Sequence, residues 1–267
     1  MKLSISTLGC PGWGLEQIVD VWSTLGVEGI EVRGIGNVMN ADEISAFFPE
    51  NRETTLALLS EKGLKLVGFG TSANFHDRSK HPQKIKEAET AIDVCVRMGI
   101  PSIRVFGNNV SKDDPEGSLA AIVDGLSRVC EYAESRGVGV NLEIHGDINT
   151  PQRLKIIVDA LSGFQCFGIV WDIYHSFVAI GNDFDSLYAV IGPYVRHVHI
   201  KDCCMRDGKP SLCSLGEGQI NIKAVVDRLL EDGYDGYFSL EHEKKWHPEL
   251  PEAEVEFPKF VQYMKKL

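Results

Sequence analysis

Four side chains of metal-binding type end four successive apolar runs in the second half of the sequence: Glu143, Asp172, His199 and Glu241. Each run has the length and composition of a short buried strand that stops where the polar residue begins. The separations are 29, 27 and 42 residues (172−143, 199−172, 241−199), and the first two match one strand-helix unit of roughly 30 residues. If the strands are parallel neighbours, all four side chains converge at one edge of a sheet.

Three carboxylates at one place repel one another unless a cation offsets their charge. The simplest explanation of the pattern is a single divalent metal ion with three oxygen ligands and one nitrogen ligand. Such a hard site suits Mn²⁺, Mg²⁺ or Co²⁺, and Zn²⁺ remains an alternative. The sequence therefore predicts one divalent ion as the cofactor.

Elements that could position these residues alternate along the whole chain. Strand-like runs in the first half cover residues 3–8, 29–33, 64–69 and 102–106, and helical patterns cover 15–25, 52–62, 82–98 and 116–135. Further helices are expected near 151–162, 182–191 and 221–232, with a last one from about Pro258. Alternation of this kind is typical of a parallel sheet, and eight such units favour a closed (β/α)8 TIM barrel in one domain, residues 1–267.

Composition narrows the class of protein. The 267 residues are close to the roughly 250 of a typical barrel of this type, and the 43% hydrophobic content is enough for a large core. The net charge of −11, from 38 acidic and 27 basic residues, argues against a nucleic-acid partner, whose phosphates such a surface repels.

Hydropathy and the spacing of the cysteines bear on membrane insertion and on the redox state of the thiols. The longest apolar runs are strand-sized, so no membrane span is expected, and the first residues enter a strand without the pattern of a signal peptide. Seven scattered cysteines suggest reduced thiols and a cytoplasmic location. The prevalence of symmetric assemblies favours an even-numbered homo-oligomer.

The alternation of strand side chains supports a common face for the ligand residues. On the expected strands Glu143 shares a face with Asn141, His199 with His197, and Glu241 with Ser239. Small or polar neighbours of this kind suit the inside of a barrel near its mouth. We interpret His197, one layer deeper, as a core histidine with one hydrogen bond.

Three further histidines are candidates for substrate binding. His175 follows Asp172 by three residues and could face the same mouth, although it could instead cap the next helix. His145 shares the parity of Glu143 and could line the pocket or support a ligand. His76, after the third strand, is a weaker candidate.

Two cationic residues and one aromatic residue complete the candidate substrate contacts. Lys201 lies two positions after His199 and points the same way, and Arg206 follows in a charged loop; each could bind a substrate oxygen or balance a carboxylate. Trp13, in a glycine-rich turn after the first strand, could form a wall of the pocket or a lid over the core. Glu31 and Arg33, which end the second strand, could form a mutual network or touch substrate.

Several segments together resemble those of a known family: residues 6–13, 26–33, 172–175, 197–202, 215–218 and 239–241. In order and spacing they resemble the xylose isomerase-like TIM-barrel superfamily, and in particular its sugar and sugar phosphate isomerase/epimerase branch, which includes D-tagatose 3-epimerase, hydroxypyruvate isomerase and inosose dehydratase. The resemblance implies that the four residues found from spacing bind one divalent ion. It also implies that His175, and an arginine whose best match is Arg206, contact substrate oxygens.

The resemblance implies a metal-dependent isomerase or epimerase in which Glu143 and Glu241 act as acid and base through an enediolate next to a ketone. A dehydratase on the same scaffold is the main alternative, and a non-catalytic sugar-binding barrel is a third. An endonuclease IV-like hydrolase is disfavoured, because that enzyme needs further histidines after strands three and four and this chain offers only His76. With no phosphate-binding signature visible, the expected substrate is an unphosphorylated sugar or a ketone derived from a polyol.

Overall fold

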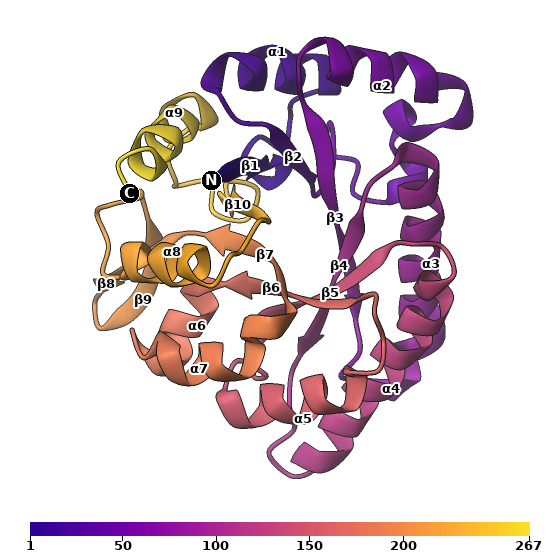
Figure 1. Ribbon diagram of the computed structural model, residues 1–267, viewed down its shortest axis with the longest axis vertical. Coiled ribbons are helices and arrows are strands. Elements are labelled where there is room, and N and C mark those ends of the chain that lie inside the picture. The colour runs from indigo at the N-terminus through magenta and orange to yellow at the C-terminus, as the bar shows by residue number, and fades with distance from the viewer.

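Eight parallel strands close into a ring in the order β1-β10-β7-β6-β5-β4-β3-β2. The computed structural model describes residues 1–267 and shows this ring surrounded by helices (Figure 1). The barrel strands are β1 (Lys2–Ser6), β2 (Gly29–Val32), β3 (Lys65–Asn74), β4 (Ser102–Asn108), β5 (Gly139–Gly146), β6 (Phe167–Asp172), β7 (Val195–Ile200) and β10 (Tyr237–Leu240). The predicted TIM barrel is therefore confirmed.

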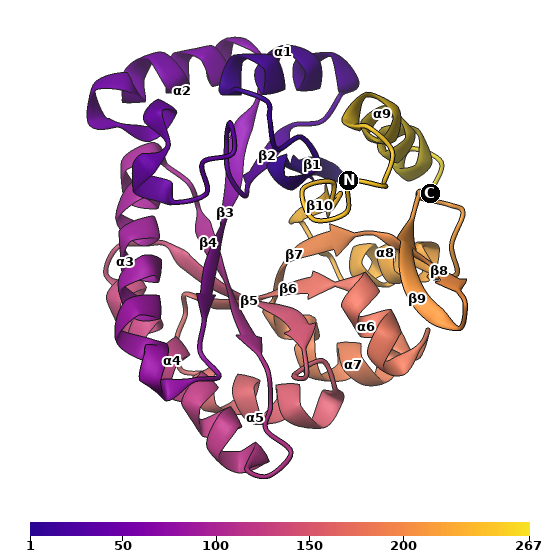
Figure 2. The ribbon, with the colours of Figure 1, turned by 180° about the vertical axis from the view of Figure 1, so that it is seen from behind.

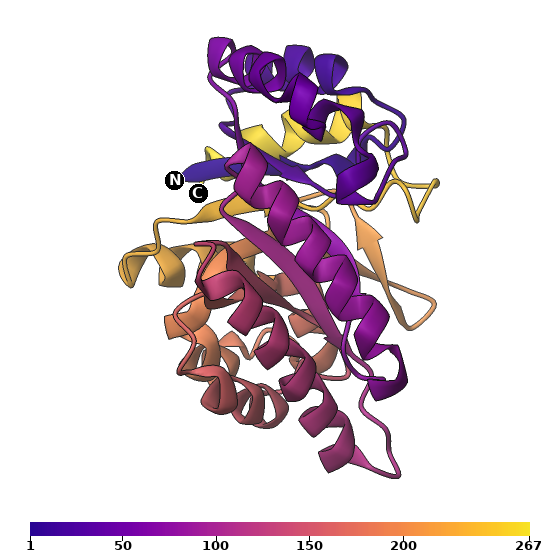
Figure 3. The same ribbon diagram turned by 90° about the vertical axis from the view of Figure 1, so that its right-hand side faces the viewer.

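The helices lie outside the ring on all sides, as the opposite view also shows (Figure 2). They are α1 (Leu15–Leu25), α2 (Arg52–Glu61), α3 (His81–Met98), α4 (Pro115–Glu134), α5 (Pro151–Leu161), α6 (Ile173–Ile180), α7 (Phe184–Ile191), α8 (Ile222–Glu231) and α9 (Ala253–Met264). The chain termini lie close together beside β1 and α9 (Figures 1 and 3). None of the helices is both long and apolar enough to cross a lipid bilayer.

Helical spacing of apolar residues explains how these helices attach to the barrel. In α1 the side chains of Ile18, Val19 and Trp22 are fully buried, because positions three and four apart share one face of a helix. The helix ends at Gly26, whose φ of 81° is a left-handed conformation that glycine adopts without steric cost. The chain can therefore turn directly into β2.

Three elements differ from the expectation. A short helix, α6, follows β6 where only a loop was expected, and α9 begins at Ala253 rather than near Pro258, which lies inside it. The charged segment after β7 forms an antiparallel hairpin of β8 (Asp202–Arg206) and β9 (Lys209–Cys213). Neither strand, Asp-Cys-Cys-Met-Arg or Lys-Pro-Ser-Leu-Cys, shows the alternation of apolar and polar residues that predicts a strand. The hairpin projects from one end of the barrel in Figure 3.

The hairpin also corrects the expectation that all thiols are reduced. A disulfide joins Cys204 to Cys213 across β8 and β9, and the other five cysteines are free. Two cysteines separated by nine positions gave no signal as a pair in the sequence, because their proximity depends on the turn between the two strands.

The alternation of strand side chains places the candidate residues inside the ring. Leu142, Val198 and Leu240 belong to the hydrophobic core that packs beneath the helices. The residues next to them on the same strands, which include the predicted ligand residues, point into the ring. The register pairs Glu143 with Val170 and Asp172 with His199 on neighbouring strands. Since parallel strands carry their carboxyl ends to the same side of the sheet, the predicted ligand residues share one end of the barrel.

Candidate metal centre

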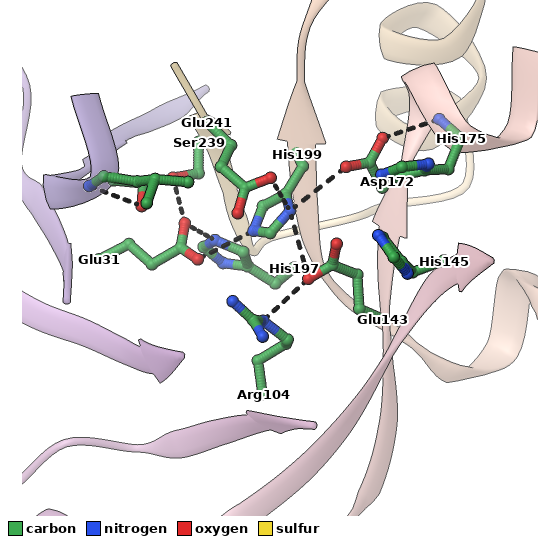
Figure 4. A network of polar contacts seen from close by, with 12 residues as sticks. Glu31, Arg104, Glu143, His145, Asp172, His175, His197, His199, Ser239 and Glu241 are labelled. Carbon is green, nitrogen blue, oxygen red and sulfur yellow. Dashed lines mark hydrogen bonds and ion pairs between the residues drawn. The ribbon is translucent and has the colours of Figure 1, made fainter. Parts of the chain in front are cut away.

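Glu143, Asp172, His199 and Glu241 meet at this end of the barrel (Figure 4). One donor atom from each side chain lies within 4.8 Å of the donor atoms of the other three, and all four residues are buried. Glu143, Asp172 and His199 lie on β5, β6 and β7, and Glu241 directly follows β10. Four consecutive strands of the ring, β10, β7, β6 and β5, thus bring together three carboxylates and one imidazole.

His199 Nδ1 is the centre of this cluster. It lies 3.2 Å from Glu241 Oε2, 3.7 Å from Asp172 Oδ2 and 3.8 Å from Glu143 Oε2. Nδ1, Asp172 Oδ2 and Glu143 Oε2 are buried without a hydrogen bond of good geometry, and the two carboxylate oxygens have ion-pair contacts only, to Lys201 and Arg104. Buried polar atoms without a hydrogen bond need an explanation, and a cation among these donors supplies one. Three oxygens and one nitrogen fit a hard divalent ion.

The other ring nitrogen of His199 is held by Glu31 on β2. His199 Nε2 lies 2.8 Å from Glu31 Oε1, while Glu31 Oε2 lies 2.9 Å from His197 Nε2 and accepts a hydrogen bond of 2.5 Å from Ser239 Oγ. A carboxylate on one imidazole nitrogen fixes the ring and leaves the other nitrogen free for a metal. His197 is thus a buried histidine with one hydrogen bond, in agreement with its interpretation from sequence.

Asp172 divides its two carboxylate oxygens between the helix and the cluster. Oδ1 accepts a hydrogen bond of 3.0 Å from the backbone N–H of His175 and so caps the start of α6. This bond orients the side chain and leaves Oδ2 directed toward His199. The missed helix α6 therefore fixes the geometry of a predicted ligand.

Two buried cations balance the carboxylates. Lys201 Nζ lies 2.7 Å from Asp172 Oδ2, 2.5 Å from Glu241 Oε2 and 2.6 Å from Glu243 Oε1. Arg104, on β4, places Nε 2.8 Å from Glu143 Oε2. Sequence reasoning placed Lys201 at the site but missed Arg104, although a charged residue inside an apolar strand was an available signal.

The charges shift the ionisation of the cluster in opposite directions. Burial raises the pKa of Glu143 to about 7, against the opposing effect of Arg104. Burial alone would lower the pKa of His199, but the carboxylates of Glu241 and Glu31 raise it well above its usual value. Burial would likewise raise the pKa of Glu241, but His199 and Lys201 lower it well below its usual range. Glu143 and Glu241 therefore differ in proton affinity although both face His199.

His145 and His175 form one wall next to the cluster. Their ring centroids are 4.2 Å apart, and His145 Nδ1 lies 3.0 Å from Asn108 Oδ1. Burial lowers the pKa of both rings, that of His175 to about 4. Both are therefore neutral at pH 7 and can donate or accept hydrogen bonds.

The remaining three candidates have contacts of their own outside the four-residue cluster, and their role in substrate binding stays a prediction. Arg206 is exposed at the end of β8 and lines a cavity of about 350 Å³ together with Tyr174. Trp13 packs edge-on against Phe257 of α9, with ring centroids 6.1 Å apart. His76 lies after β3 and its buried Nδ1 makes no hydrogen bond.

The Glu31 network gives a testable prediction. In the Glu31→Gln variant the single amide oxygen cannot accept hydrogen bonds from His197, His199 and Ser239 as a carboxylate does, so the His199 ring is less firmly held. We expect the affinity for Mn²⁺ to fall by about 10- to 100-fold, measured by competition with a chelating dye. Glu217→Gln, which removes an exposed carboxylate paired with Lys259, is the control and should bind Mn²⁺ normally; equal affinities in both variants would contradict the role of Glu31.

Comparison with known proteins adds independent information. The family model "Xylose isomerase-like TIM barrel" matches residues 19–265. The chain is 26% identical to inosose dehydratase of Bacillus licheniformis over 76% of each chain, and 22% identical to fructoselysine 3-epimerase of Shigella flexneri over 90% of each. It spans only 41% of a further, 36% identical relative of uncharacterized function. The crystal structure of the IOLI protein with a bound zinc atom superposes with a TM-score of 0.75 at 20% identity, over 100% of this chain and 96% of that one.

Proposed function

Since this chain belongs to the xylose isomerase-like TIM barrel family, we propose that it is a divalent-metal-dependent isomerase or epimerase of a sugar or of a ketone derived from a polyol. The observation that carries the proposal is the buried convergence of three carboxylates on His199 Nδ1, a buried nitrogen that has no hydrogen-bond partner. The similarity to inosose dehydratase and to fructoselysine 3-epimerase supports an enzyme of this kind.

The proposed ligands of the ion are Glu143, Asp172, His199 and Glu241. When bound, a divalent cation supplies Lewis-acid stabilisation of the negative charge that develops on the substrate oxygens. Glu31 holds the His199 ring so that Nδ1 faces the three carboxylates. The zinc atom in the structurally similar IOLI protein is consistent with a divalent ion.

The proposed acid and base are Glu143 and Glu241, which approach from β5 and from the end of β10. Glu143 is a buried carboxylate whose second oxygen can accept a proton from carbon and return one, as a general base requires. Glu241 stays ionised because His199 and Lys201 stabilise its charge, and it would face the substrate from the opposite side. His145 and His175, both neutral, would donate hydrogen bonds to the substrate oxygens.

Dehydration is the second candidate reaction, favoured by the similarity to inosose dehydratase. Both reactions start when the carbon next to the ketone loses a proton, and they differ in whether the enediolate regains a proton or expels a β-hydroxyl group. The acid and base proposed here serve either outcome, so the product decides between them.

Proton exchange in D₂O tests the proposal. Protein loaded with Mn²⁺ is incubated with a panel of ketoses and inososes, and products are followed by NMR. We expect deuterium at the carbon next to the ketone, dependent on Mn²⁺ and abolished by a chelator. Deuterium without loss of water supports an isomerase or epimerase, and an absorbing enone supports a dehydratase. Sugar-dependent thermal stabilisation without exchange or elimination would instead indicate a binding protein and contradict the proposal.

A further inference from the structure

Arg33 is a buried cation at the same end of the barrel that the proposed reaction does not use. It directly follows β2 and is 8% exposed. Its backbone N–H donates to Thr7 Oγ1 at 2.8 Å, and Nη2 donates to Ser72 Oγ at 2.7 Å. Nη1 is buried without a hydrogen-bond partner. The guanidinium is thus fixed on one side and has a free donor on the other.

A glycine on β3 lets this side chain lie beside a second arginine. A Cβ atom at Gly70 would lie 2.7 Å from Arg33 Cδ and 2.8 Å from Arg104 Nη2, closer than real side chains allow. Gly70 is also opposite Arg104 in the register of β3 and β4. The missing side chain therefore makes room for two guanidinium groups in front of β3, next to Glu143.

Arg33 is the cation of this region that lacks a carboxylate partner. Lys201 pairs with Asp172 and Glu241, and Arg104 pairs with Glu143. No ion pair within 4.0 Å involves Arg33. Burial and the neighbouring Arg104 lower its pKa to about 10, against the opposing effect of the more distant carboxylates of Glu241, Glu87 and Glu143, so Arg33 is still protonated at pH 7. A buried charge without a partner is costly, which makes an anionic ligand at Nη1 favourable.

We infer that the substrate carries a carboxylate group, which Arg33 binds through Nη1 while the ketone faces Glu143 and Glu241. The inference rests on the proposed function and names its substrate class, a keto sugar acid. One unpaired guanidinium matches the single charge of a carboxylate, and its donors suit carboxylate geometry. A phosphate, with a charge of about −1.5 to −2 at pH 7, would leave excess negative charge beside a cluster already rich in carboxylates.

Three ketoses that differ only at carbon 6 test the inference: fructose, fructuronate and fructose 6-phosphate. Their dissociation constants for the Mn²⁺-loaded protein are measured by calorimetry at constant ionic strength. We expect fructuronate to bind at least about tenfold more tightly than fructose, since a hydrogen bond to a charged group contributes this much. Fructose 6-phosphate is expected to bind more weakly than fructuronate.

Variants assign the preference to Arg33. Arg33→Gln should bind fructuronate and fructose equally, and Arg33→Lys should retain part of the preference because it keeps the charge. Gly70→Ala, which leaves every charge in place but crowds both guanidiniums, should also weaken the preference. Arg128→Gln, which removes an exposed guanidinium on α4, is the matched control and should behave like the unmodified protein. Circular dichroism confirms that each variant is folded.

Any result other than these overturns the inference. Equal binding of fructose and fructuronate, or binding of none of the three ketoses, shows that Arg33 does not select a carboxylate. A preference that survives in Arg33→Gln places the anion elsewhere, and tighter binding of fructose 6-phosphate assigns the site to phosphate. This test measures binding and not turnover. A protein that prefers fructuronate but catalyses no proton exchange would therefore contradict the proposed function and leave this inference intact.

Discussion

The Glu143→Gln variant should keep its metal ion and lose most of its turnover. The amide retains an oxygen that can face a cation, but it cannot accept a proton from carbon. General acid-base catalysis typically contributes roughly 10²–10⁴-fold, so we expect kcat to fall by about this factor on the ketose identified by exchange in D₂O. Deuterium uptake should fall in parallel, and elemental analysis should still find about one Mn²⁺ per chain.

The control for this variant is Glu134→Gln, which removes an exposed carboxylate at the end of α4. It should retain normal turnover and normal metal content. A Glu143→Gln protein with full metal occupancy and near-normal deuterium uptake would show that Glu143 is at most a ligand. The base would then have to be sought among His145, His175 and Lys201.

Replacing Lys201 by methionine should produce the largest loss of stability. Lys201 is fully surrounded by protein and lies within 2.7 Å of oxygens from Asp172, Glu241 and Glu243. Lys201→Met leaves these carboxylates buried without their cation, and breaking a buried ion pair in this way costs about 3–5 kcal/mol. We expect the free energy of unfolding of the metal-free protein, from urea titration, to fall by about this amount.

Saturating Mn²⁺ should restore part of that stability, because an ion that binds only the folded state stabilises it. Lys223→Met is the control: Lys223 pairs with Asp227 on the exposed face of α8, and such pairs contribute only about 0.3–0.5 kcal/mol. If Lys201→Met and Lys223→Met lost equal stability, Lys201 would not be the cation that balances the cluster.

Local spacing was enough to predict the barrel and the residues that meet at its mouth. Glu143, Asp172 and His199 each end an apolar run, and runs one strand-helix unit apart become neighbours in a parallel barrel. The spacing of the apolar residues and the order of the strand-like and helical segments were enough, since a regular alternation of strands and helices predicts a parallel barrel. The assignment of these residues as metal ligands stays a prediction.

Contacts across the barrel could not be predicted in the same way. Glu31 and Arg104 come from β2 and β4, and their roles depend on which distant side chains they meet inside the closed ring. Arg206 lies at the end of a hairpin strand and Trp13 packs against α9, and their role as substrate contacts stays a prediction. Sequence spacing predicts which side chains share a face within one strand. It does not predict where a side chain lies in a loop or a hairpin.

The hydrogen bond between Glu31 and His199 joins residues 168 positions apart, which has a consequence for how the chain matures. All four proposed ligands lie between positions 143 and 241 and could gather in a half-built barrel. The carboxylate that fixes the His199 ring comes from β2, and contacts so distant in sequence form late because long loops must close first. We therefore expect cation uptake at the proposed site to depend on completion of the ring. A chain that lacks its first two strands would keep the four proposed donors but lose Glu31, and we expect its His199 ring to be less firmly oriented for an ion.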